Sequence, residues 1–167
     1  MHDGERQMPI KPMDELKELI GTSRHTVEEF SIEPGKVAEF AGAIHNADPI
    51  HRDEEAARQA GHERIPAPPT FLMAKQFPRH RADPDQEEIS FDLGFDLEQV
   101  LHGEQEFKFD RPVYVGDVLS GETTLTDIYR KGSMTFAVLE TEYYDQTGER
   151  VAIDRTTLIE RGGDVNE

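Results

Sequence analysis

Hydrophobic residues in the first part of the chain recur at the spacing of helices. Residues 13–21 place three apolar side chains on one face of a short helix, and residues 34–44 repeat apolar positions at i, i+3, i+4 and i+7. Residues 53–61 open with acidic side chains, which favour a helix N-terminus, and close on a glycine. The pattern therefore predicts three helices, with a strand over 24–32 between the first two.

The most hydrophobic segment of the chain follows a cluster of prolines. Residues 70–77 read TFLMAKQF, which is apolar on nearly every side, and prolines stand at positions 66, 68 and 69. Prolines suit the first turn of a helix, and a helix that is apolar all round is a buried one. This segment is therefore predicted to be a buried helix. Residues 81–97 carry six acids and one arginine and are expected to form an exposed connection.

From residue 98 onward the apolar positions alternate with polar ones. Gln105, Phe107 and Phe109 alternate with charged neighbours, as in a half-buried strand. Short turn sequences containing glycine separate the stretches that follow. Further strands are expected at 117–130, 134–144 and 150–160. Consecutive strands with short turns indicate an antiparallel meander.

Helices first and strands afterwards indicate an α+β domain in which a curved antiparallel sheet wraps a helix. The length of 167 residues suits one domain. We expect a loose leader over residues 1–12, a single domain over 13–161 and a short tail over 162–167.

Composition narrows the possible partners. There are 35 acidic residues against 18 basic ones, a net charge of −17, which repels nucleic acid and anionic membranes. Cysteine is absent, so disulfides and thiolate chemistry are excluded. No apolar run approaches the roughly 20 residues of a membrane span, and the N-terminus lacks a secretory signal. These features predict a cytoplasmic protein.

The segment between two predicted helices, AIHNADPIHRDEEAA, concentrates groups that transfer protons. It contains Asn46, Asp48 and His51, and histidine is suited to proton transfer near neutral pH. The alternative is that Asn46 and Asp48 cap the following turn and His51 covers an edge. His45 and His51 alone lack a third ligand at recognisable spacing, so no metal site is expected. Common nucleotide-binding and serine-hydrolase motifs are also missing.

This segment resembles the hydratase motif of the MaoC-like (R)-specific enoyl hydratases and hydroxyacyl dehydratases, G-D-x-N-P-[LIV]-H. Pro49, Ile50 and His51 match the motif, whereas Asn46 stands at its Asp and Asp48 at its Asn. APPTF at 67–71 and LHGEQEFKFDRPVYVGD at 101–117 are similar to the fatty-acid-synthase-type dehydratase branch of this family.

The resemblance implies a hotdog fold, in which an antiparallel sheet wraps a long central helix. It also implies addition of water to a 2-enoyl thioester, or its removal from the (R)-3-hydroxyacyl thioester, without a cofactor. The substrate would be an acyl thioester of coenzyme A or of acyl carrier protein, bound by a homodimer or by a heterodimer with a related hotdog chain. The sequence shows no obvious basic cluster for docking an acidic carrier protein, which favours coenzyme A.

The resemblance also suggests roles for individual residues. His51 and Asp48 become the acid/base pair, with Asn46 beside them, and backbone N–H groups at Thr70 or Phe71 would bind the thioester oxygen. His102 and Gln105 become candidates for the substrate channel, with a structural role as the alternative for His102.

Two other functions fit the same fold. Because Asn46 stands where active members carry Asp, the chain could be a non-catalytic, acyl-binding subunit of a heterodimeric dehydratase. A hotdog thioesterase is the third candidate, since proteins of one fold share thioester substrates while their chemistry differs.

Overall fold

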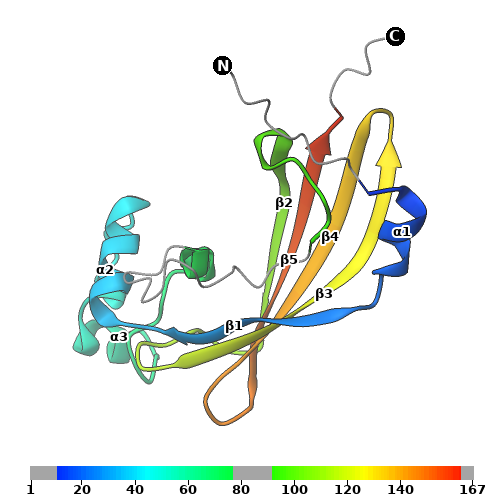
Figure 1. Ribbon diagram of the computed structural model, residues 1–167. Coiled ribbons are helices and arrows are strands. Elements are labelled where there is room, and N and C mark those ends of the chain that lie inside the picture. The colour runs from blue at the N-terminus through cyan, green and yellow to red at the C-terminus, as the bar shows by residue number, and fades with distance from the viewer. Residues whose placement is uncertain (1–10, 77–91, 163–167) are drawn as a thin grey trace, which may run out of the picture.

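The computed structural model describes residues 11–76 and 92–162, which form one twisted sheet with short helices at its two ends (Figure 1). Helices α2 and α3 lie at one end of the sheet and α1 lies at the other. The elements in chain order are α1 (Met13–Glu18), β1 (Ser23–Ser31), α2 (Pro34–Ala43), η1 (Pro49–His51), α3 (Glu54–Gln59), η2 (Phe71–Gln76), η3 (Leu97–Gln99), β2 (Val100–Phe109), β3 (Val118–Lys131), β4 (Met134–Tyr144) and β5 (Arg150–Arg161).

The five strands are antiparallel and lie in the order β1-β3-β4-β5-β2. The predicted meander is confirmed for β3, β4 and β5, but it is wrong for β2, which pairs with β5 instead of β3. The reason is that the link from Asp110 to Asp117 is no tight turn. It runs to the helical end of the sheet, where Val113 accepts a hydrogen bond from the Ala67 N–H.

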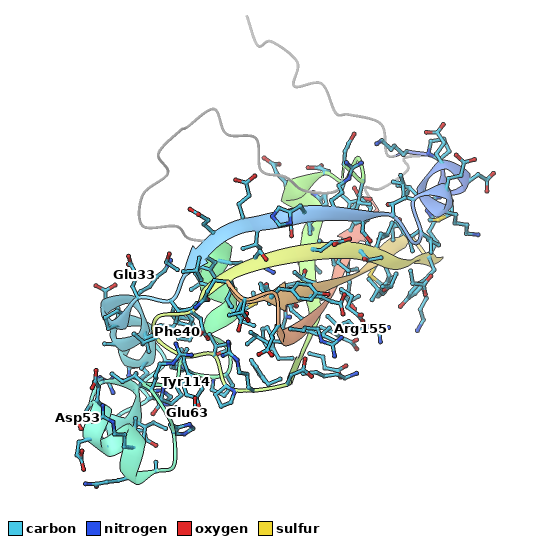
Figure 2. All side chains as sticks on the ribbon, turned by 90° about the horizontal axis from the view of Figure 1, so that it is seen from below. Glu33, Phe40, Asp53, Glu63, Tyr114 and Arg155 are labelled. Atoms are coloured by element: carbon cyan, nitrogen blue, oxygen red, sulfur yellow. The ribbon has the colours of Figure 1, made fainter. Side chains whose placement is uncertain are left out.

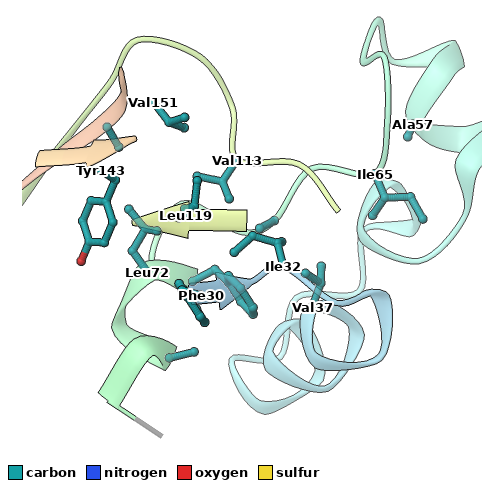
Figure 3. Packing of buried hydrophobic residues seen from close by; sticks show 14 residues of the cluster. Phe30, Ile32, Val37, Ala57, Ile65, Leu72, Val113, Leu119, Tyr143 and Val151 are labelled. Carbon is teal, nitrogen blue, oxygen red and sulfur yellow. The ribbon is translucent and has the colours of Figure 1, made fainter. Parts of the chain in front are cut away.

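The sheet has an inner face, which helices cover, and an outer face. At one end of the inner face, Leu16 of α1 packs with Leu125, Ile128 and Ala137. At the other end, η2 packs its buried side chains against β3 and β4. Figure 3 shows this contact, with Leu72 beside Tyr143 and Leu119. The alternation predicted from the sequence therefore separates the side chains that face the core from those that face outward.

The segment predicted as a buried helix over 70–77 is buried but is not an α-helix. Its described part is a 3-10 helix of six residues, η2, in which Phe71 and Leu72 are almost completely buried. The Phe71 N–H donates to the Pro68 carbonyl, and the Met73 N–H to that of Thr70, so the prolines lead into a tighter turn. Any continuation beyond residue 76 lies outside the described residues.

Two of the predicted helices are shorter in the structure than expected. Helices α1 and α3 end at Glu18 and Gln59, and the turns that follow them carry Gly21 and Gly61 at positive φ. Most of the connection expected over 81–97 and of the leader over 1–12 lies outside the described residues. Within the described part, Lys11 forms an ion pair with Asp92, 2.8 Å between Nζ and Oδ2.

Candidate active site

His51 is a buried histidine at the end of η1, with only 5% of its surface exposed. Its Nδ1 lies 2.8 Å from the carbonyl oxygen of Pro66. A carbonyl only accepts hydrogen bonds, so Nδ1 carries the proton and donates it. In the neutral ring Nε2 is then unprotonated and can accept a proton. This contact fixes the tautomer that general base catalysis requires.

The Pro66 carbonyl is held in place by a short ladder between two connecting segments. Pro66 bridges to Tyr114, while the Val115 N–H donates to Ile65 and the Ala67 N–H donates to Val113, at 2.9 and 2.7 Å. The RPV…GD sequence at 111–117 therefore forms the turn that supports the histidine's partner.

A buried carboxylate, Asp117, closes this turn. It is 1% exposed and accepts hydrogen bonds from the Tyr114 N–H at 2.9 Å, from Arg64 at 3.0 Å and from Arg111 at 2.7 Å. Arg111 also donates to Asp145 at 2.9 Å. These contacts show that Asp117 stabilises the turn that precedes β3.

The loop that leads to His51 starts with a Schellman motif. The His45 N–H donates to Gly42 and the Asn46 N–H donates to Ala41, and His45 itself has φ +56°. Glycine is the usual residue at this left-handed position. The backbone thus explains why the hydratase motif carries glycine where this chain has His45.

Asn46 and Asp48 form local turn contacts. Asn46 Oδ1 accepts from the Asp48 N–H at 3.0 Å, and Asp48 Oδ1 accepts from the Ile50 N–H at 3.1 Å. Arg52 holds the same loop by donating to the carbonyl oxygens of both residues. Among the hydrogen bonds of the described residues, none joins the exposed Asp48 carboxylate to the His51 ring.

Thr70 and Phe71 differ in what they offer a substrate. The Phe71 N–H is committed to Pro68 at 2.9 Å, and its buried ring stacks on Phe30 and meets Phe40 edge-on. Thr70 is exposed, and its N–H donates to no acceptor within residues 11–76 and 92–162. Of the two predicted donors, Thr70 is therefore the one whose backbone N–H can donate to an oxygen of a bound substrate.

His102 and Gln105 lie on β2, an edge strand, and the structure does not bring them to His51. His102 is exposed. Gln105 donates to Asp154 through its side-chain amide and accepts at 3.0 Å from the Thr156 hydroxyl. Gln105 is thus part of a polar cluster on the inner face of the sheet.

This cluster centres on Asp154, which is 1% exposed, and the sequence analysis did not identify it. Lys75 of η2 donates to Asp154 Oδ2 at 3.1 Å and also to the Tyr143 hydroxyl. Burial, followed by the charge of Asp154, raises the pKa of Tyr143 well above its usual value. Two features of the sequence indicate this cluster: a lysine lies within an apolar segment, and an aspartate lies at an inward position of an alternating strand.

Within the described part of the chain, no three His, Asp or Glu side chains are grouped so that they could hold a metal ion. No helix within residues 11–76 and 92–162 has the length and apolarity needed to span a membrane.

Comparison with known proteins places this geometry in a family. Residues 18–154 match the family model of the FAS1-like dehydratase domain region. A UPF0336 protein of Clavibacter michiganensis is 36% identical over 160 residues, which is 94% of this chain and 99% of that protein.

Solved structures give the same result. A MaoC-like dehydratase superposes with a TM-score of 0.72 at 26% identity, over 89% of this chain and 44% of that longer chain. The C-terminally truncated HadBC (3R-hydroxyacyl-ACP dehydratase) complex of Mycobacterium tuberculosis gives 0.68 at 26% identity, over 84% of this chain and 96% of that one. The predicted hotdog fold and α+β class are confirmed. The chain belongs to the FAS1-like dehydratase family of MaoC-like hotdog proteins.

Proposed function

We propose that this protein is an (R)-specific 2-enoyl-thioester hydratase, which in reverse is a 3-hydroxyacyl-thioester dehydratase. The observation that carries the proposal is the buried His51, whose Nδ1–H is bound to Pro66 and whose Nε2 is left to accept a proton. In the dehydration direction His51 takes the proton from C2, the C3–O bond breaks, and the hydroxyl leaves as water with a proton that the second acid/base group, Asp48, supplies. One such acid/base group contributes about 10²–10⁴-fold to the rate.

The other predicted residues have supporting roles in this proposal. Asp48 is the second acid/base group, and its Oδ2 forms no hydrogen bond among the described residues. Asn46 orders the Asp48 backbone. As the thioester oxygen gains charge, the Thr70 N–H donates to it, which stabilises the enolate. The proposed substrate is an acyl-CoA or acyl-carrier-protein thioester in the cytoplasm, and the proposed assembly is a homodimer or a pair with a related hotdog chain.

Hydration of crotonyl-CoA, followed by the loss of enoyl-thioester absorbance, tests the proposal. We expect His51→Ala to lower kcat/KM by about 10²–10⁴-fold, and Asp48→Asn to lower it less if the two groups share the proton transfers. His25→Ala changes an exposed histidine on β1 and serves as the matched control, with activity unchanged. Full activity of folded His51→Ala would refute the role of His51.

A second function is favoured by one observation. The Asp48 carboxylate is exposed and caps the η1 turn instead of contacting His51. This arrangement suits a subunit that binds the acyl chain while a related hotdog chain supplies the acid/base pair. Wild-type protein that is inactive alone, and active only when co-purified with such a chain, would select this function.

Measuring free thiol with the same substrate distinguishes a thioesterase from a hydratase. A thioesterase releases free coenzyme A, which a thiol reagent detects. Because this chain has no cysteine, the protein itself contributes no thiol signal. Thiol release from acyl-CoA without hydration would replace the hydratase proposal.

A further inference from the structure

A row of apolar side chains crosses the outer face of the sheet, opposite the face that α1 and η2 cover. The strand register aligns its members directly, one on each of four neighbouring strands. We call these residues the apolar row: Leu101 on β2, Ile159 on β5, Phe136 on β4 and Tyr129 on β3. The outer face of a one-sided sheet is normally polar, so a continuous apolar row needs an explanation.

Much of the apolar row is accessible to a partner. Leu101 is 44% exposed, Tyr129 is 40% exposed, and the flanking Met134 is 36% exposed. The rings of Tyr129 and Phe136 are stacked, with centroids 5.0 Å apart and planes 3° apart. Exposed, contiguous apolar surface bordered by charge is typical of protein contact sites.

Charges of opposite sign border the two sides of the apolar row. On β3, Lys131 lies two residues beyond Tyr129, toward the β3–β4 turn, and Asp127 lies two residues before it. On the neighbouring strands, Arg161 lies on the Lys131 side and Glu104 on the Asp127 side. The face is therefore basic on one side of the row and acidic on the other.

We propose that the outer face binds a second copy of this chain, with a two-fold axis along the apolar row. A two-fold axis there stacks each member of the row on its own copy and exchanges the two sides of the face. Lys131 of one protomer then lies over Asp127 of its partner. The charge pattern is thus complementary to itself, which is why a second copy is the occupant proposed.

The acidic side of the row is also hollowed. A groove of about 690 Å³ runs along it and includes Arg155, which Figure 2 shows on the sheet, away from Asp53 and Glu63 at the helical end. Its lining contains three carboxylates and one guanidinium, and it consists of Glu104, Gln105, Glu106, Asp127, Tyr129, Val138, Arg155 and Thr157. The same two-fold rotation places the partner's β3–β4 turn, with Lys131, over this groove.

This proposal gives a contact face to self-association of the chain and does not depend on the proposed chemistry, because the apolar row and His51 lie on different parts of the fold. Sedimentation velocity over a range of protein concentrations measures the self-association. Phe136→Glu places a charge at the centre of the contact, and we expect it to raise the dissociation constant by about 10–100-fold and to halve the mass of the largest assembly. Ile20→Glu is the matched control, since Ile20 is 41% exposed but lies between α1 and β1.

Charge reversal at two exposed positions tests the geometry without touching the core. Lys131→Glu and Asp127→Lys should each weaken self-association several-fold, and the double variant should restore it to within about twofold. The two side chains are four residues apart on one strand, roughly 13 Å, so rescue within one chain is excluded. An assembly mass that Phe136→Glu leaves unchanged, or charge reversals without mutual rescue, would overturn the proposal. Unchanged circular dichroism shows that each variant is folded.

Discussion

Removing the Asp117 carboxylate should destabilise the protein more than the loss of any exposed ion pair. Asp117 is 1% exposed and accepts three hydrogen bonds, from the Tyr114 N–H, Arg64 and Arg111. Asp117→Ala removes the acceptor for all three. The Tyr114 backbone N–H, in a residue that is itself buried, is left without a partner.

The magnitude follows from what each donor loses. A buried N–H without an acceptor costs about 1–3 kcal/mol, and a hydrogen bond to a charged group contributes about 1.5–3 kcal/mol. Arg64 is 42% exposed and can form hydrogen bonds with water instead, and Arg111 retains its ion pair with Asp145. Each guanidinium group therefore loses less than the full energy of its hydrogen bond to Asp117. We expect a loss of about 3–5 kcal/mol in the free energy of unfolding. Asp117→Asn keeps an acceptor for the N–H and should lose only about 1–3 kcal/mol.

Urea unfolding at pH 7, followed by circular dichroism, measures these differences. The control is Glu54→Ala, which breaks the exposed pair with Arg58 and should cost about 0.5 kcal/mol or less. A loss below about 1 kcal/mol for Asp117→Ala, or a larger loss for Asn than for Ala, would refute the reasoning.

Two further predictions concern the loop and the acid limb of stability. His45→Gly should raise the free energy of unfolding by about 0.5–1 kcal/mol in the same assay, because φ +56° strains histidine but not glycine; a loss of stability would contradict this. Hydrogen bonds from Thr147 and Arg111 hold the pKa of Asp145 well below its usual value. The contribution of Asp145 to the free energy of unfolding is therefore present at neutral pH. It is lost as the pH falls below about 4, where the carboxyl of the unfolded chain becomes protonated. Asp145→Asn should therefore lower stability at pH 7 and flatten the acid limb of a stability–pH curve; an equal loss at all pH values would argue against this linkage.

Local periodicity predicted most of the secondary structure, because the helical and strand spacings reflect which face is buried. Strands β3, β4 and β5 lie within one or two residues of the expected ranges. The position of β2 could not be predicted in this way, because it depends on a long link that crosses to the helical end of the sheet. The 3-10 geometry of η2 depends on hydrogen bonds to Pro68 and Thr70 that apolarity alone does not specify.

The candidate site was only partly predictable, because residue types are visible in the sequence whereas tertiary contacts are not. The residue types around His51 make it a candidate for proton transfer, but its hydrogen-bond partner is a backbone carbonyl 15 residues away, which no side chain in the sequence indicates. The cluster of Lys75 and Asp154 joins residues 79 positions apart. Such contacts follow from tertiary packing, which neither spacing nor composition reveals.

A series of backbone contacts links the buried carboxylate of Asp117 to the His51 ring. Asp117 binds the Tyr114 backbone, Tyr114 bridges to Pro66, and the Pro66 carbonyl fixes the protonated nitrogen of His51. Each contact in this series is a hydrogen bond or a strand-like bridge, so a change at Asp117 reaches the imidazole without touching a substrate. Under the proposed hydratase function, Asp117 would be a positioning residue, and we expect a loss of turnover in its variants to reflect a displaced or reoriented His51. The RPV…GD turn thus serves the histidine loop as well as the stability of the sheet.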